Sequence, residues 1–301
     1  MKQLSIFFVA LILIVFITGS KKELTTVYKS FTVDNPYKVY ALSLPDSLAF
    51  AGELVPLDKP DVRERLDREL LVNTYWQSNM MLLMKRANKY FPTIEPILKK
   101  EGIPDDFKYL AVIESGLEQA RSYKGASGFW QIMKTTGREM GLEINSNVDE
   151  RYHIAKATRV ACKYLNRAYK KFGNWTLAAA SYNRGVAGIN RNLIRQGVND
   201  YYDLYLGEET RRYIFRILAV KDIMENPQKY GYVFEDDDLY NHPEVKTVGL
   251  DTAITNISQF AKQMGVNYKE LKLHNPWLLQ NHLNNKSRKY YEIDLPTVSG
   301  D

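Results

Sequence analysis

The segment Ala111-Val112-Ile113-Glu114-Ser115-Gly116 places one carboxylate at the end of an apolar helical run that starts at Phe107. A carboxylate held among apolar neighbours keeps its proton to a higher pH, so Glu114 is a candidate general acid. A few residues later, the segment Gly125-Ala126-Ser127-Gly128-Phe129-Trp130-Gln131-Ile132-Met133 supplies glycine, aromatic and amide groups. A site for a neutral, hydroxyl-rich substrate needs such groups nearby. These two segments therefore predict where the chemistry of the chain lies.

The composition is that of a globular protein with one large domain or two modest ones. Of its 301 residues, 25% are charged and 45% are hydrophobic, which is enough for a sizeable core. The formal net charge of +6 favours an anionic neighbour, such as a membrane surface or an acidic cell-wall polymer. There is no compact basic run, which argues against nucleic acid as a partner.

The N-terminus has the pattern of an export signal. Met1-Lys2 carries positive charge, residues 4–17 are almost all apolar, and Thr18-Gly19-Ser20 supplies small residues. This run is shorter than the roughly 20 residues of a spanning helix and matches a signal-peptide core. We expect residues 1–20 to be a signal peptide or a membrane anchor, and the protein to lie in the periplasm or cell envelope. Cleavage and retention as an anchor both stay open.

Several classes of site lack their sequence patterns. The chain has one cysteine, Cys162, and its four histidines show no ligand spacing, so we expect no metal and no cofactor. There is also no P-loop, no dinucleotide glycine fingerprint and no nucleophile elbow. What remains is one well-placed glutamate, Glu114.

The middle of the chain reads as a helical domain over residues 60–233, preceded by a linker or N-terminal extension over 21–59. Apolar residues recur at helical spacing from Asp61 to Ala87, and Pro92 predicts the end of that helix. Further predicted helices are 94–100, 104–114, 135–140, 154–172, 175–182 and 213–224.

A different pattern follows an acidic linker over residues 234–244. The predicted elements of residues 245–297 are a strand at 245–248, helices at 254–264 and 268–274, and a strand at 290–296. This order predicts a small β-α-α-β module.

Three motifs now carry a family resemblance: Glu114-Ser115, the glycine-aromatic segment 125–132, and Ala179-Ala180-Ser181-Tyr182-Asn183. In this order they resemble the motifs of the soluble-lytic-transglycosylase family, enzymes that cleave bacterial peptidoglycan. The resemblance covers about residues 60–233 and implies a mainly α fold of the goose-lysozyme type. One departure is Ser181, where the family often has alanine.

Two later features are similar to the membrane-bound murein transglycosylase D branch of that family. They are Glu209-Thr210-Arg211-Arg212-Tyr213-Ile214, and Pro227 with Tyr230-Gly231-Tyr232. The C-terminal module resembles a LysM module, which binds N-acetylglucosamine chains. The family's Gly-Asp-Thr-Leu is here Leu250-Asp251-Thr252-Ala253. The resemblance therefore implies the fold, and leaves glycan binding open.

The resemblance implies a mechanism that needs one glutamate. Protonated Glu114 gives its proton to the oxygen between N-acetylmuramic acid and N-acetylglucosamine, and its carboxylate then takes a proton from the muramic acid 6-hydroxyl. The product is a 1,6-anhydro sugar. The implied substrate is the peptidoglycan glycan strand, and we expect a monomer.

The resemblance also implies roles for the neighbours of Glu114. Tyr182 hydrogen-bonds to Glu114 and orients it, and Asn183 stabilises that loop or contacts substrate. Ser115 and Gln131 hold acetamido and hydroxyl groups. The residues expected to form the floor of the cleft are Phe129, Trp130 and Met133. For Phe129 and Trp130, core packing is the alternative. Tyr213 lines the peptide-stem end of the groove or fills the core.

Two other functions stay open. A goose-lysozyme-type hydrolase shares the fold and one main glutamate but uses water, and the sequence offers no clear second acid to position that water. A wall-binding scaffold without catalysis is the non-enzymatic alternative. The combination of Glu114, Gln131 and Tyr182-Asn183 argues against it.

Overall fold

The structure is a computed structural model that describes residues 39–241 and 244–297. The predicted signal or anchor, residues 1–20, and residues 21–38 of the predicted linker lie outside the described residues. Within the described part of the chain, no helix is long and apolar enough to cross a membrane.

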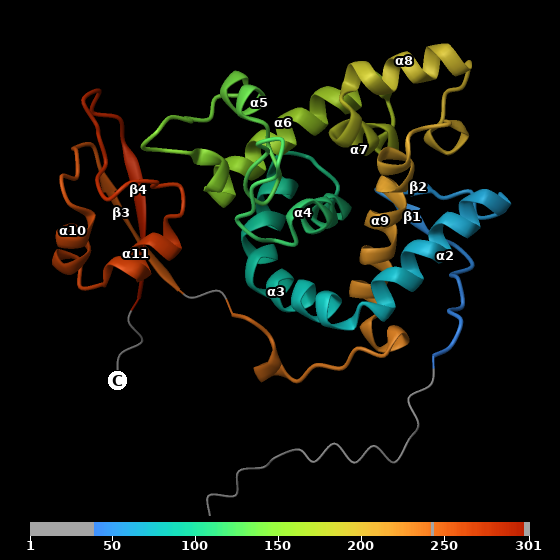
Figure 1. Cartoon of the computed structure of the whole chain (residues 1–301), viewed down its shortest axis with the longest axis horizontal. Coiled ribbons are helices and arrows are strands. Elements are labelled where there is room, and N and C mark those ends of the chain that lie inside the picture. The colour runs from blue at the N-terminus through green and yellow to red at the C-terminus, as the bar shows by residue number, and fades with distance from the viewer. Residues whose placement is uncertain (1–38, 242–243, 298–301) are drawn as a thin grey trace, which may run out of the picture. The chain divides into compact units, whose positions relative to one another are not determined.

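The described chain is mainly helical, as the sequence predicts, with two small two-stranded sheets (Figure 1). The helices are α2 (Pro60–Tyr75), α3 (Gln77–Lys100), α4 (Lys108–Ser115), α5 (Lys134–Glu139), α6 (Ile154–Phe172), α7 (Trp175–Arg184), α8 (Val186–Gln196), α9 (Glu208–Glu225), α10 (Ile257–Gln263) and α11 (Tyr268–His274). The strands are β1 (Ala49–Phe50), β2 (Glu53–Leu54), β3 (Val245–Leu250) and β4 (Tyr291–Pro296).

Helix α4 is the buried centre of the helical part. It packs against α3 and α9, and residues 109–112 are all buried (Figure 1). A helix of eight residues is not stable alone in water, so this packing is what holds it. Gly116 ends the helix in the left-handed conformation, with φ of 63°. Glu114 is thereby fixed in the last turn, at the edge of the core.

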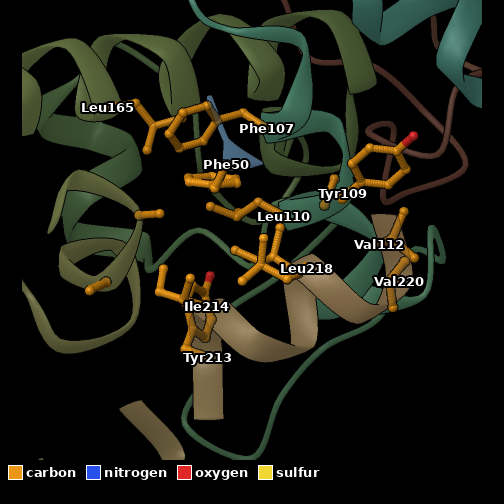
Figure 2. Close-up of a cluster of buried hydrophobic side chains, with 14 of the residues drawn as sticks. Phe50, Phe107, Tyr109, Leu110, Val112, Leu165, Tyr213, Ile214, Leu218 and Val220 are labelled. Carbon is orange, nitrogen blue, oxygen red and sulfur yellow. The ribbon is translucent and has the colours of Figure 1, made fainter. Parts of the chain in front are cut away.

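The segment just before α2 belongs to this core, so residues 48–57 of the predicted linker or N-terminal extension form a packed extension and not a linker. Phe50 is fully buried and meets Phe107 edge-on at 5.1 Å, in the cluster that Figure 2 shows with Leu110 and Tyr213. The Glu53 carboxylate accepts hydrogen bonds from the first backbone N–H groups of α7, at 2.6 and 2.8 Å. Strands of two residues leave no periodicity in a sequence, so these long-range contacts were not predicted.

The first helical region breaks at Trp76 rather than at Pro92. Trp76 has φ of −92° and ψ of 61°, and α3 then continues through Pro92 and Pro96 to Lys100. A proline inside a helix removes a backbone hydrogen bond. Packing of α3 against α4 and α6 outweighs that loss. Helix α8 was not predicted. It begins at Val186, and Gly185, with φ of 80°, separates it from α7.

The C-terminal module has the predicted β-α-α-β order. Strands β3 and β4 are antiparallel, with Val245 opposite Pro296 and Leu250 opposite Tyr291, and α10 and α11 lie between them in sequence. A second apolar core fills the module and includes Val148, from the loop before α6. The mainly α class and the small β-α-α-β module are both confirmed.

Direct bonds hold this module to residues 143–153. Val148 forms a β-bridge with Leu278, and the Asp149 N–H donates to the Trp277 carbonyl at 3.0 Å. The ammonium group of Lys289 pairs with Glu143 at 2.6 Å. The module is therefore attached to residues 143–153 by apolar packing, backbone hydrogen bonds and an ion pair.

Candidate active site

Glu114 receives a direct hydrogen bond from a tyrosine of another helix. The Tyr213 hydroxyl on α9 donates to Oε1 of Glu114 at 2.5 Å. Burial raises the pKa of Glu114 above its ordinary value, and the charge of Glu209 adds to the rise. The Tyr213 bond and the positive charge of Arg216 oppose it. The net pKa shift of Glu114 is upward, which is the direction that the sequence predicted for this carboxyl group.

Tyr213 was expected at the edge of the groove or in the core, and its bond to Glu114 was not predicted. Only 2% of its surface is exposed, and burial raises the pKa of its hydroxyl well above the ordinary value. The hydroxyl therefore remains a donor at all physiological pH values. Arg216 lies one turn further along α9 and donates to the Ile113 carbonyl at 3.0 Å. The helical spacing of these two residues is the signal that could have revealed them.

Tyr182 does not bond to Glu114, so that part of the prediction is wrong. Its hydroxyl donates to the Trp130 carbonyl at 2.7 Å. Tyr182 still lies near the acid, because burial and then the charge of Glu114 raise the pKa of its hydroxyl. The side chain ties α7 to the glycine-aromatic loop, and so supports the site indirectly.

Asn183 links α7 to the first turn of α9. Its amide nitrogen donates to Glu209 at 3.0 Å, and its Oδ1 accepts from the Thr210 hydroxyl at 2.8 Å. The predicted loop-stabilising role fits these bonds. Because Tyr213 follows Thr210 by three residues on α9, the bonds also help to set the position of the Tyr213 hydroxyl.

The glycine-aromatic loop is shaped by two close approaches. Gly128 has φ of 76°, and a Cβ there would lie 2.1 Å from the Arg151 carbonyl oxygen, so only glycine fits. Gln131 also has a positive φ, 44°, which is unusual for a residue with a side chain. Its amide nitrogen donates to the carbonyls of Ala120 and Gly128 at 3.1 and 2.8 Å. These bonds leave its Oε1 as an acceptor without a partner in the described residues.

Ser115 attaches the end of α4 to the same loop. Its hydroxyl donates to the Phe129 carbonyl at 2.9 Å. The loop is further held by Arg151, whose guanidinium donates to the carbonyls of Gly125 and Ile132 at 2.8 and 3.1 Å. Arg151 is itself paired with Asp149 at 2.7 Å, and both side chains are buried. Arg151 was not among the predicted site residues, because nothing in its sequence position marks it.

Two of the three residues predicted for the cleft floor lie in the core instead. Trp130 is fully buried and its indole N–H donates to Thr158 Oγ1 at 2.8 Å. Phe129 is 2% exposed and meets the Tyr90 ring edge-on at 4.7 Å. Core packing, the alternative considered for both, describes them correctly. Met133 is 43% exposed and lines a cavity of 480 Å³ together with Arg121 and Lys124.

The other acids of the α4 region have partners elsewhere. Glu118 pairs with Arg86, Asp105 with Lys108, and Asp106 with Lys221. Glu209 is the acid whose charge acts on Glu114, and the sequence did not single it out as a site residue.

Comparison with known proteins agrees with the motifs. Residues 92–204 match the family model of the transglycosylase SLT domain, and residues 246–299 match that of the soluble lytic transglycosylase C-terminal LysM-like domain. The resemblance inferred from the sequence is therefore confirmed.

Two curated relatives are lytic murein transglycosylases. The chain is 29% identical over 239 residues to membrane-bound lytic murein transglycosylase D of Escherichia coli K12, and equally to that of Escherichia coli O6:H1. These matches cover 76% of the chain and 51% of each relative, so the chain spans about half the length of the curated relatives it matches. A solved structure of an inactive mutant of lytic transglycosylase Slt from Pseudomonas aeruginosa is 21% identical, with a TM-score of 0.36, and the match covers 51% of this chain and 26% of that one.

Proposed function

We propose that the chain is an exported peptidoglycan lytic transglycosylase with Glu114 as its single catalytic acid and base. The observation that carries this proposal is the state of Glu114. It is a carboxyl group with a raised pKa at the edge of the core, and the Tyr213 hydroxyl holds it.

In the proposed reaction, protonated Glu114 donates its proton to the glycosidic oxygen between N-acetylmuramic acid and N-acetylglucosamine. The bond from C1 to that oxygen breaks, and N-acetylglucosamine leaves with the proton. The carboxylate then takes a proton from the muramic acid 6-hydroxyl, whose oxygen bonds to C1. An internal nucleophile replaces water, which favours the reaction by proximity and makes a second carboxylate unnecessary.

The neighbouring residues have positioning roles in this proposal. Tyr213 holds Glu114 and stabilises its carboxylate form between the two proton transfers. The free Oε1 of Gln131 accepts from an acetamido N–H of the substrate, and Ser115 fixes the loop that carries Gln131. Catalysis is assigned to residues 60–233 together with 48–57.

The mass of released muropeptides tests the reaction. Purified sacculi are incubated with the full-length chain, with Glu114→Gln, and with Glu118→Gln. Glu118 is the control because it lies four residues after Glu114 and pairs with Arg86. We expect products one water lighter than hydrolytic fragments from the wild type and from Glu118→Gln, and none from Glu114→Gln. Reducing ends would instead indicate a lysozyme-like hydrolase, for which Glu209 is the acid available beside Glu114. Full activity of Glu114→Gln would refute the assignment.

The proposed location is the cell envelope, reached through residues 1–20. Fractionation of cells that express the full chain checks this, with an N-terminal deletion of 1–20 as the control. We expect the full chain in the envelope fraction and the deletion in the cytoplasm. Cytoplasmic full-length protein would contradict export.

A further inference from the structure

A polar cavity of 340 Å³ lies between α8 and the first turn of α9. It adjoins residues of the candidate active site at two points of the sequence, because Arg184 at the end of α7 directly follows Asn183, and Glu208 at the start of α9 directly precedes Glu209. The charged side chains that line it are Arg184, Arg195, Arg211 and Glu208. Three cations thus face one acid.

One acid does not balance three cations in this cavity. Glu208 is largely exposed, and its carboxylate lies 3.7 Å from Arg212, a residue that does not line the cavity. The guanidinium groups of Arg184 and Arg211 have no hydrogen bond and no carboxylate partner within the described residues. An excess of unpaired positive charge therefore remains in a concave, polar site.

Helix α8 determines where two of the arginines lie. Gly188 is buried, and a Cβ there would lie only 3.0 Å from Cγ of Arg184, so the aliphatic part of Arg184 rests on the helix where a side chain is missing. Arg195 donates to Oδ1 of Asn192 at 2.9 Å, and Asn192 donates to the Gly188 carbonyl at 2.8 Å. These contacts hold both arginines toward the cavity before any ligand arrives.

Guanidinium groups bind carboxylates through paired, charge-assisted hydrogen bonds. A peptidoglycan strand carries carboxylates on its peptide stems, and on the lactyl group of muramic acid where the stem has been removed. We propose that this cavity binds a carboxylate of the peptide stem, and so makes the enzyme prefer strands that carry stems. The proposal rests on the proposed function and deepens it by naming the part of the substrate that Arg184 and Arg211 contact.

The test compares three substrates: strands with intact stems, strands with their stem carboxylates converted to neutral amides, and strands from which an amidase has removed the stems. The KM of the full-length wild type is measured on each, beside Arg184→Gln/Arg211→Gln. The matched control is Arg191→Gln, an exposed arginine of α8 that does not line the cavity. We expect amidation to raise the wild-type KM roughly fivefold, which is about 1 kcal/mol at 1.4 kcal/mol per tenfold. The double variant should show that higher KM on intact strands, with no further change on amidated ones.

Three outcomes would overturn the proposal. Wild-type KM values that do not change on amidation would mean that the arginines only face solvent. If the KM of the double variant rises equally on intact and amidated strands, the two arginines have a structural role. A low KM on amidase-treated strands, lost in the double variant, would move the contact to the lactyl carboxylate.

A binding measurement separates this proposal from the proposed function. Calorimetric titration of the full-length chain with the dipeptide L-alanyl-γ-D-glutamate, and with its diamide, does not depend on cleavage. We expect binding of the dipeptide alone, weakened at least fivefold in the double variant and unchanged in Arg191→Gln. Binding without any anhydro product would leave the carboxylate site standing while the reaction assignment fails. Equal binding of dipeptide and diamide would refute the site.

Discussion

Replacing Tyr213 by phenylalanine removes one hydroxyl and tests how the site controls Glu114. The lost bond is 2.5 Å long, ends on a carboxylate and is buried. Hydrogen bonds to charged groups contribute about 1.5 to 3 kcal/mol. If the bond supports the carboxylate during proton transfer, kcat should fall roughly 10- to 150-fold at 1.36 kcal/mol per tenfold.

The sign of the accompanying pH effect follows from the donor. Tyr213 stabilises the charged form of Glu114, so its loss raises the pKa of Glu114 further. The pH profile of anhydro-muropeptide release should therefore move toward alkaline pH. The folded protein should also lose stability more steeply as pH rises, because ionising Glu114 becomes more costly in the folded state.

The assay combines kcat as a function of pH with melting temperature as a function of pH. Tyr201→Phe is the matched control, since its hydroxyl donates only to the backbone carbonyls of Thr210 and Arg211, at 2.8 and 2.7 Å. We expect the control to lose stability without moving the pH profile. An unchanged kcat and an unchanged profile in Tyr213→Phe would refute the reasoning.

Three further changes have defined outcomes. Glu114→Gln should melt at a higher temperature than the wild type at pH 7, and the difference should vanish toward pH 4. The reason is that a raised carboxyl pKa destabilises the folded protein only where the group is ionised. Equal melting temperatures at pH 7 would contradict this. Arg151→Ala leaves the buried Asp149 carboxylate unpaired and should lower the free energy of unfolding by about 3 to 5 kcal/mol in urea denaturation; a loss below about 1 kcal/mol would be incompatible with that pair. Phe50→Ala should lower it by about 3 to 5 kcal/mol, and Leu54→Ala, at a side chain that is 75% exposed, by less than about 0.5 kcal/mol; similar losses would argue against a packed N-terminal segment.

The fold was predictable where the signal is local. Helical spacing, glycine stops such as Gly173 and the strand pattern of residues 290–296 each depend on neighbours in sequence, and they gave the helical class and the β-α-α-β module. The burial of Phe50 was not predictable, since it depends on a contact with Phe107, far away in the chain. Pro92 misled for the same reason, because packing of α3 against distant helices outweighs a local helix breaker.

In the candidate site, too, the features that depend on local sequence were predictable and those that depend on packing were not. The position of Glu114 at the end of a buried helix could be inferred from the apolar run before it. The partner of Glu114 could not, because both Tyr182 and Tyr213 are tyrosines near the acid and only the packing of α7 and α9 decides which hydroxyl reaches it. Arg151 is a similar case, since it supports the loop through hydrogen bonds to two backbone carbonyls, and no sequence motif predicts such bonds.

The interface between residues 143–153 and the C-terminal module determines what a truncated variant of this chain can be used to test. Deleting the module would strip the cover from Val148, leave the Asp149 N–H without the Trp277 carbonyl and leave Glu143 without Lys289. Arg151, which grips the loop that carries Gln131, lies in that same uncovered segment. Removing the module would therefore disturb the segment that supports the candidate site, whether or not the module binds sugar. Point substitutions on the outer surface of the module, and not its deletion, should therefore be used to test what the module binds.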